Sequence, residues 1–210
     1  MENGFLNAII NLLEKNKSFP NYHAERRIDI FINFFMKDIL TEYLEKEVKF
    51  ICPEFPLKKE EGNLSTKLDY LYKTNDEVVF VELKTDVKSF DIDQMNYYFH
   101  HRTWKPWEEY LIHILDKTKH ENYITLRNEL EKYELFGNNL KDLPIRVIYV
   151  SPELKDSNKR KIQLLNYELI NFKYIDSLLK DINEHASEWN TLTKFFKSFK
   201  LGVFEIIKME

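Results

Sequence analysis

The spacing of apolar residues switches between two periods along the chain, and this predicts a protein of mixed α and β structure. In residues 2–16 and 22–45, apolar side chains recur every three or four positions, as they do on one face of an amphipathic helix. Residues 47–83 instead contain short runs rich in Val, Leu, Tyr and Phe, which favour strands. After residue 89 the helical spacing returns, with one further apolar run at residues 143–150.

A hairpin is predicted at the centre of the strand-forming region. The runs KLDYLYK and EVVFVELK flank Asn75 and Asp76, a pair that tolerates the backbone of a two-residue loop. With these two residues as the loop, Leu71 faces Phe80 across the hairpin. Because side chains alternate between the faces of a strand, this register also decides which polar residues share a face.

The same register brings two carboxylates and one ammonium group together at one end of the hairpin. Asp69 lies across from Glu82, and Lys84 follows on the same face. Opposed carboxylates repel each other unless a cation lies between them, and carboxylate oxygens are ligands that Mg²⁺ and Mn²⁺ favour. The alternative is a solvated face, on which a Glu–Lys pair contributes little stability. Apolar residues on both faces of the hairpin predict a buried strand and therefore favour the site.

The other elements follow from breaks in the same patterns. The strand that begins near Glu47 is predicted to end at Cys52, because Pro53 and Pro56 follow and proline is confined to strand ends, edges and bulges. The run at residues 143–150 is predicted to join the hairpin in parallel after a helical crossover. Further helices are expected at residues 89–101, 108–115, 122–136, 158–171, 174–184 and 187–200, and residues 203–207 form either a last strand or a docked tail.

The segment HHRTWKPWEEY, which contains Trp104 and Trp107, mixes basic and aromatic residues. Two interpretations stay open from the sequence. The tryptophans either pack in the core or stack on unpaired bases, with Arg102 and Lys105 on the neighbouring phosphates.

Composition narrows the class of protein. The 210 residues, 43% of them apolar, suffice for one domain with a packed core. Cys52 is the single cysteine, which excludes an intrachain disulfide and fits a reducing cytoplasm. The chain has no apolar run of about 18 residues and no secretory signal pattern, so we expect a cytoplasmic protein without a membrane partner. With 31 basic and 35 acidic side chains the net charge is −4, so contact with nucleic acid requires a local basic patch.

Two motifs resemble those of a known nuclease superfamily. Asp69, followed by a hydrophobic strand and the run Glu82-Leu83-Lys84, resembles the PD-(D/E)xK signature. Gln94 and Tyr98 match the QxxxY motif that follows this signature in the RecB-like branch. The motifs cover about residues 22–100, and the order of elements extends the resemblance to about residue 151.

The resemblance implies a restriction-endonuclease-like fold of the α/β class. Its αβββαβ core, a mixed central sheet flanked by helices, is expected at about residues 22–151. A helical insertion precedes the fourth strand, and a C-terminal helical part covers about residues 152–210. We therefore expect a single domain over residues 1–210. The chain departs from the signature at Leu68, because a proline often precedes the acidic residue there.

The resemblance also implies a bound metal ion, Mg²⁺ or Mn²⁺. Its expected ligands are Asp69, Glu82 and the backbone carbonyl of Leu83, with Glu25 from the helix at residues 22–45 as a further ligand. RecB-like members use a histidine in this region, so His23 is the alternative to Glu25. Spacing alone leaves two explanations of Glu25 equally open. It is either a carboxylate of the site or an acidic residue stabilised by the dipole at a helix N-terminus.

Three further residues complete the expected catalytic set with Asp69 and Glu82. Lys84 is expected to orient or activate the attacking water. Gln94 and Tyr98, four residues apart on one helix face, are expected to reach the metal site or the substrate phosphate. A capping box begun by Asp91 is the alternative explanation of Gln94, and packing in the core is the alternative for Tyr98.

Together these residues predict a metal-dependent deoxyribonuclease that hydrolyses DNA phosphodiester bonds. The first alternative is a catalytically inactive nuclease-fold module that binds nucleic acid or protein, which the acidic net charge supports. The second is a structural protein whose apolar helices form a homo-oligomer. The joint presence of Asp69, Glu82 and Lys84 favours the enzyme, because a purely structural domain has no reason to hold these three residues together.

Overall fold

A central five-stranded sheet organises the molecule. The structure, a computed structural model, describes residues 4–16, 25–58, 65–84, 96, 98, 102–115, 120–137, 142–151, 154, 156–181 and 185–198. The strands are β1 (Lys49–Lys58), β2 (Ser65–Lys73), β3 (Val78–Leu83), β4 (Ile145–Ser151) and β5 (Glu168–Asn171), in the spatial order β1-β2-β3-β4-β5. Strands β1 to β3 pair antiparallel, whereas β4 and β5 add in parallel. The predicted α/β class with a mixed sheet, and the parallel addition of β4, are therefore confirmed.

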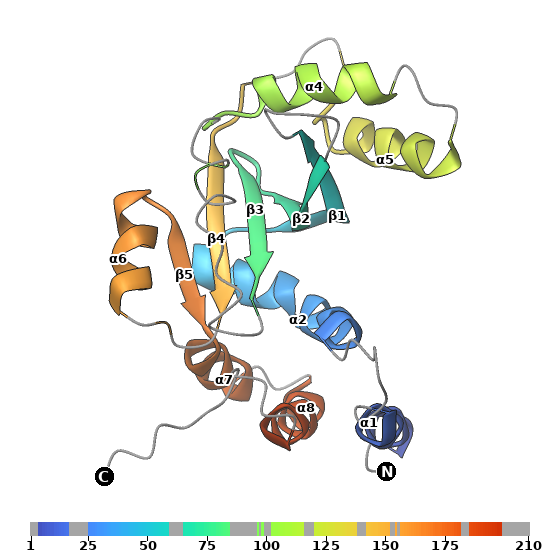
Figure 1. Cartoon of the computed structure of the whole chain (residues 1–210), viewed down its shortest axis with the longest axis vertical. Helices are drawn as coiled ribbons and strands as arrows, with labels where there is room; N and C mark the ends of the chain where they lie inside the picture. Colours follow the sequence, from blue (N-terminus) through green and yellow to red (C-terminus); the bar gives the residue numbers. More distant parts are fainter. Residues whose placement is uncertain are drawn as a thin grey trace.

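Helices cover both faces of this sheet (Figure 1). One face packs against α1 (Gly4–Asn16), α2 (Glu25–Leu44), α7 (Phe172–Asp181) and α8 (Ala186–Ser198). The other face packs against α4 (Lys105–Leu115), α5 (Glu121–Lys132) and α6 (Asp156–Leu164). Within the described residues, no helix is long and apolar enough to cross a membrane.

The hairpin of β2 and β3 has the register that its sequence predicts. Leu71 pairs with Phe80, and the backbone N–H of Thr74 donates to the carbonyl of Glu77 at 2.9 Å to close the turn. Both faces of the hairpin are buried, as expected. Leu71, Val78 and Phe80 lie in the core under α4 to α6, and Tyr70, Tyr72, Val79 and Val81 lie in the core on the opposite face.

Strand β1 is longer than predicted. It continues through both prolines to Lys58, with Pro53 opposite Tyr70 and Pro56 opposite Lys67. The prediction that it ends at Cys52 is wrong because β1 is an edge strand, and an edge strand tolerates proline where a central strand does not. A bulge between Phe50 and Cys52 shifts the register within the same strand.

The helix predicted at residues 158–171 is two elements. Helix α6 ends at Leu164, and β5 follows at Glu168–Asn171 as the other edge of the sheet. Between them Asn166 has a φ of 53°, a left-handed conformation that asparagine adopts more readily than most residues and that ends a helix without glycine. The apolar residues of β5 continue the spacing of the helix, which is why the pattern conceals the strand.

The two tryptophans of the basic and aromatic segment belong to the core. Trp104 and Trp107 are buried, and the indole N–H of Trp104 donates to the carbonyl of Leu135 at 2.8 Å. Both rings contact Phe80 edge-on, with ring centroids 6.4 and 5.6 Å away. Buried rings present no face to a base, so the stacking alternative is wrong.

The remaining helices are found close to their predicted positions. Helix α5 ends at Lys132, with Tyr133 as its cap, four residues before the predicted end at residue 136. Of the helix expected at residues 89–101, the structure describes residues 96 and 98, and both are helical. The tail at residues 203–207 lies outside the described residues.

Candidate active site

The candidate site begins where β2 and β3 separate. Their ladder of paired residues runs to Tyr70 and Val81. Beyond this pair, the backbone N–H of Leu83 donates to Oδ2 of Asp69 at 2.7 Å, and the N–H of Lys84 donates to the carbonyl of Val150 on β4 at 2.8 Å. The Asp69 carboxylate thus accepts a backbone donor at the end of the antiparallel ladder. This contact fixes Asp69 beside the carboxyl end of β3.

Glu82 is the most deeply buried acidic group of the site, with a relative exposure of 2%. Its Oε1 accepts a hydrogen bond from Nζ of Lys84 at 2.8 Å, and its Oε2 accepts one from the hydroxyl of Tyr98 at 2.8 Å. A buried carboxylate is tolerated only when it is paired and hydrogen-bonded. These two donors therefore hold the orientation of the Glu82 side chain and offset part of its desolvation.

Asp69 and Glu82 interact directly, as the hairpin register predicts. Burial, the negative charge of Glu82 and a side-chain hydrogen bond with Glu82 raise the pKa of Asp69 to about 7. The hydrogen bond from Leu83 and the positive charge of Lys84 oppose this rise in pKa, but they do not cancel it. The surroundings of Asp69 as a whole thus disfavour its negative charge, which is the condition that a bound cation relieves.

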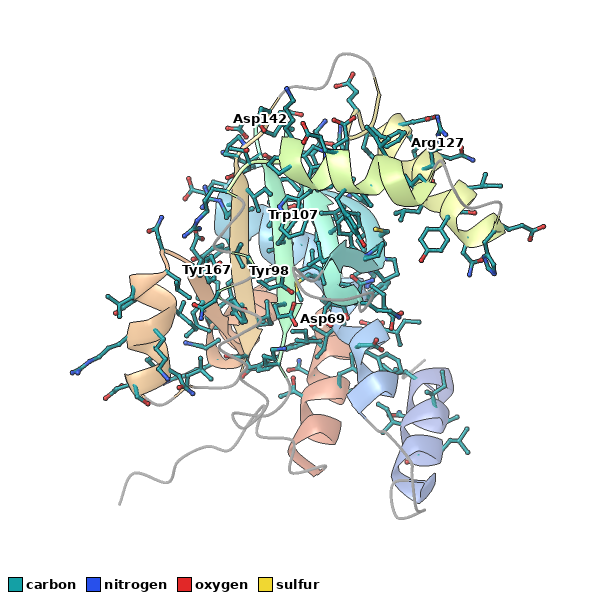
Figure 2. The ribbon with its side chains drawn as sticks, turned by 45° about the horizontal axis from the view of Figure 1, so that its top comes forward. Asp69, Tyr98, Trp107, Arg127, Asp142 and Tyr167 are labelled. Atoms are coloured by element: carbon teal, nitrogen blue, oxygen red, sulfur yellow. The ribbon has the colours of Figure 1, made fainter. Side chains whose placement is uncertain are left out.

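Tyr98 connects the site to the core of the sheet. Its ring is buried, and burial followed by the charge of Glu82 holds the pKa of its hydroxyl well above the usual range, so the hydroxyl is a donor. Asp69 and Tyr98 lie toward the lower part of the sheet in Figure 2, away from Asp142 at the top. The Tyr98 hydroxyl therefore contacts Glu82 and its ring belongs to the core, while its role at a metal or phosphate stays a prediction.

Two residues near the site were missed by the sequence analysis. Tyr149 on β4 pairs with Glu82, and its ring stacks on that of Tyr167 with centroids 6.0 Å apart. Ser151 is fully buried at the end of β4, one position beyond the last pair, Leu83 and Val150. Both residues could have been predicted from the parallel register between β3 and β4, because this register aligns Tyr149 with Glu82.

Several predicted site residues fall at the limit of the described chain. Glu25 is the first residue of α2, but its side chain is not among those described, and His23 and Gln94 lie outside the described residues. Leu83 is in place at the end of β3, and the role of its carbonyl stays a prediction. Within the described part of the chain, no group of three or more His, Cys, Asp or Glu side chains is arranged to hold a metal ion.

The donors that are present fit a magnesium-type ion. Such an ion is commonly held by one or two carboxylates, with waters and substrate phosphate as its other ligands. Asp69 and Glu82 supply two carboxylates, and each of their oxygens carries two lone pairs, so the hydrogen bonds described above leave acceptor capacity. The chemistry of the pair therefore matches a hard cation better than a thiolate- or imidazole-bound transition metal.

Comparisons with known families, with curated proteins and with solved structures give no match to this chain. The interpretation of the site therefore depends on its own geometry and on the sequence motifs.

Proposed function

We propose that the chain is a metal-dependent nuclease that hydrolyses DNA phosphodiester bonds, with a restriction-endonuclease-like core. One observation carries the proposal: Asp69 and Glu82 meet at the carboxyl end of β3 with Lys84 beside them. The order of α2, the antiparallel strands β1 to β3 and the parallel strand β4 supports the αβββαβ core.

Each residue of the proposed site has a separate task. The hydrogen bond from Leu83 orients the Asp69 carboxylate, and the Tyr98 hydroxyl orients that of Glu82. In this proposal both carboxylates are metal ligands. Lys84 has donors only and is no ligand. Its ammonium orients the attacking water or stabilises negative charge on the phosphate. A bound Mg²⁺ or Mn²⁺ supplies Lewis-acid stabilisation of charge on the phosphate and the leaving group.

A second function has one observation in its favour. Lys84 lies 2.8 Å from Glu82 and partly neutralises it, as it would in a nuclease fold that has lost its metal and only binds nucleic acid or protein. This alternative does not account for the raised pKa of Asp69, because a domain that only binds a partner does not need two carboxylates placed against each other. We therefore prefer the enzyme.

The test is a cleavage assay on linear, circular and single-stranded DNA with Mg²⁺ or Mn²⁺. We expect cleavage that a chelator abolishes and that Asp69→Asn loses. Asp76→Asn, the same change at the opposite end of the hairpin, should cleave like the parent. No cleavage with either ion, or undiminished cleavage by Asp69→Asn, would contradict the proposed function.

A further inference from the structure

Helix α6 follows directly from the candidate site. Strand β4 ends at Ser151, beside the end of β3, and α6 begins at Asp156. Five backbone steps of at most about 3.6 Å place the start of α6 within about 18 Å of Ser151. Ile162 of α6 is buried in the same core as Phe80 and Tyr98, so the helix covers the sheet face that carries Glu82. In Figure 1, α6 lies beside β5, which separates it from β4 in this view.

The charge of α6 differs from that of the other helices on this face. Its sequence, DSNKRKIQL, holds three basic residues and one acidic residue. Helices α4 and α5 each hold more acidic than basic residues. In α5 the cations are also neutralised locally, because Arg127 pairs with Glu131 and Lys132 pairs with Glu129. Among the described helices of this face, α6 therefore carries the positive charge.

Two cations of α6, Arg160 and Lys161, are available to a partner. Arg160 and Lys161 are exposed and make no ion pair with any residue that the structure describes. Lys159 pairs with the exposed Asp156 at 3.9 Å and is not counted among these available cations. Because the whole chain has a net charge of −4, this positive charge is local to α6. A compact basic surface of this kind is what a strand of phosphates contacts.

We propose that α6 binds the DNA backbone next to the candidate site, with Arg160 and Lys161 as its phosphate contacts. This inference rests on the proposed function, because it places the bound strand across the carboxyl ends of β3 and β4. An anionic membrane is the weaker partner, because Leu164 is the one exposed apolar residue of this short helix and offers little surface for insertion.

The experiment measures binding and cleavage separately. A labelled DNA strand is titrated with the parent and with the double variant Arg160→Gln/Lys161→Gln, first without divalent ions and at several salt concentrations. Glutamine keeps the helix propensity and removes the charge. We expect affinity to fall about five- to tenfold per lost cation at 0.1 M salt, and the salt dependence to weaken by about one to two ions.

The control is Lys37→Gln/Lys194→Gln, which removes the same charge from exposed positions on α2 and α8, the helices of the opposite face. It should bind DNA like the parent. The α6 proposal is overturned if both double variants lose the same affinity for DNA, or if the α6 variant loses none. It is also overturned if the parent does not bind DNA. So does α6-dependent binding to anionic vesicles without binding to DNA.

The cleavage arm separates this inference from the proposed function. If the parent cleaves DNA, the α6 variant should have a higher KM than the parent and nearly the same kcat. An unchanged KM would reject the α6 surface and would leave the nuclease proposal intact. If the parent binds DNA through α6 but never cleaves it, the α6 surface stands and the nuclease proposal fails.

Discussion

The two ends of strand β3 hold acidic groups in opposite ways. At the turn end, Glu77 accepts hydrogen bonds from Lys46 at 3.1 Å and from Arg146 at 2.7 Å, and Lys46 also pairs with Asp76 at 2.9 Å. At the other end, Asp69 and Glu82 are placed against each other with Lys84 beside them. The first arrangement distributes cations among the carboxylates, whereas the second brings like charges together.

The pKa values of the two aspartates reflect this difference. Hydrogen bonds from Lys46 and then from Thr74 hold the pKa of Asp76 below its usual range. Burial and the charge of Glu82 raise the pKa of Asp69 to about 7. The surroundings at the turn end therefore favour the charged form of Asp76, whereas those at the carboxyl end disfavour the charged form of Asp69. Unfavourable charge that a fold maintains in this way is typical of functional sites.

The largest contrast is expected from one substitution made at each end. Glu77→Gln should lower the free energy of unfolding by about 2 kcal/mol, because Arg146 and Lys46 each lose one charged partner and keep another, Glu168 and Asp76. Glu82→Gln should change it by less than about 1 kcal/mol, because the lost pairing with Lys84 is offset by relief of the repulsion from Asp69. Urea unfolding of both variants measures the difference, and equal losses would remove the distinction between the two ends.

The next contrast concerns turnover and the two lysines. Lys84→Ala should lower the rate of DNA cleavage by about 10²-fold or more, because the ammonium beside the attacked phosphate is gone. Its affinity for Mg²⁺ should stay the same or rise, since a positive charge near the ion is removed. Lys46→Ala, at the turn end, should lower stability without changing the rate per folded molecule. Equal cleavage by the parent and Lys84→Ala would end the catalytic assignment of Lys84.

A smaller contrast is expected in the dependence of stability on pH. The pKa of Asp69 is higher in the folded state, at about 7, than its ordinary value of 3.8, so the folded state binds the proton more tightly. Its contribution to stability therefore falls as the pH rises from about 4 to about 7. Without metal, Asp69→Asn should stabilise the protein relative to the parent by about 2 kcal/mol more at pH 8 than at pH 5.

The matched variant for the pH experiment is Asp76→Asn, whose parent group has a lowered pKa. Its effect should have the opposite sign: the variant loses stability relative to the parent as the pH rises through the ordinary aspartate range. Unfolding midpoints at several pH values check both predictions. A pH-independent difference between the parent and Asp69→Asn would show that Asp69 titrates normally.

The smallest contrast with a matched control is expected for Tyr98→Phe. The change removes the hydroxyl that donates to Glu82 and keeps the buried ring, so the free energy of unfolding should fall by about 1.5 kcal/mol. Cleavage should slow by up to about tenfold, because Glu82 loses one of the groups that orient it. Tyr72→Phe, which removes a buried hydroxyl bonded to Asn33 on the opposite face, is the control, and it should leave cleavage unchanged. An equal slowing in both variants would assign the effect to packing.

The sequence predicted the hairpin better than the edges of the sheet. Alternation and a two-residue turn determine which residues face each other, and this was enough to bring Asp69 and Glu82 together. The length of β1 could not be predicted, because the tolerance of Pro53 and Pro56 depends on β1 being an edge strand. Strand β5 was hidden because one left-handed residue, Asn166, ends α6 without a change in apolar spacing.

The candidate site was predicted only in part for a related reason. Asp69, Glu82 and Lys84 belong to one hairpin, whose register is a local property. Tyr149 and Ser151 come from β4, more than sixty residues further along the chain, and only the register between β3 and β4 aligns them with this end of the sheet. Tyr98 was found through a motif and not through spacing, because its contact with Glu82 depends on how its helix packs.

The most direct test of the account is a calorimetric titration of Mn²⁺ into the parent, Asp69→Asn and Asp76→Asn at one pH. The account predicts binding in the parent and in Asp76→Asn, and binding at least tenfold weaker in Asp69→Asn, because Asp69 is a proposed metal ligand whereas Asp76 is paired with Lys46. Equal Mn²⁺ affinity in all three proteins, or no binding by the parent, would contradict the assignment of Asp69 and Glu82 as a metal site.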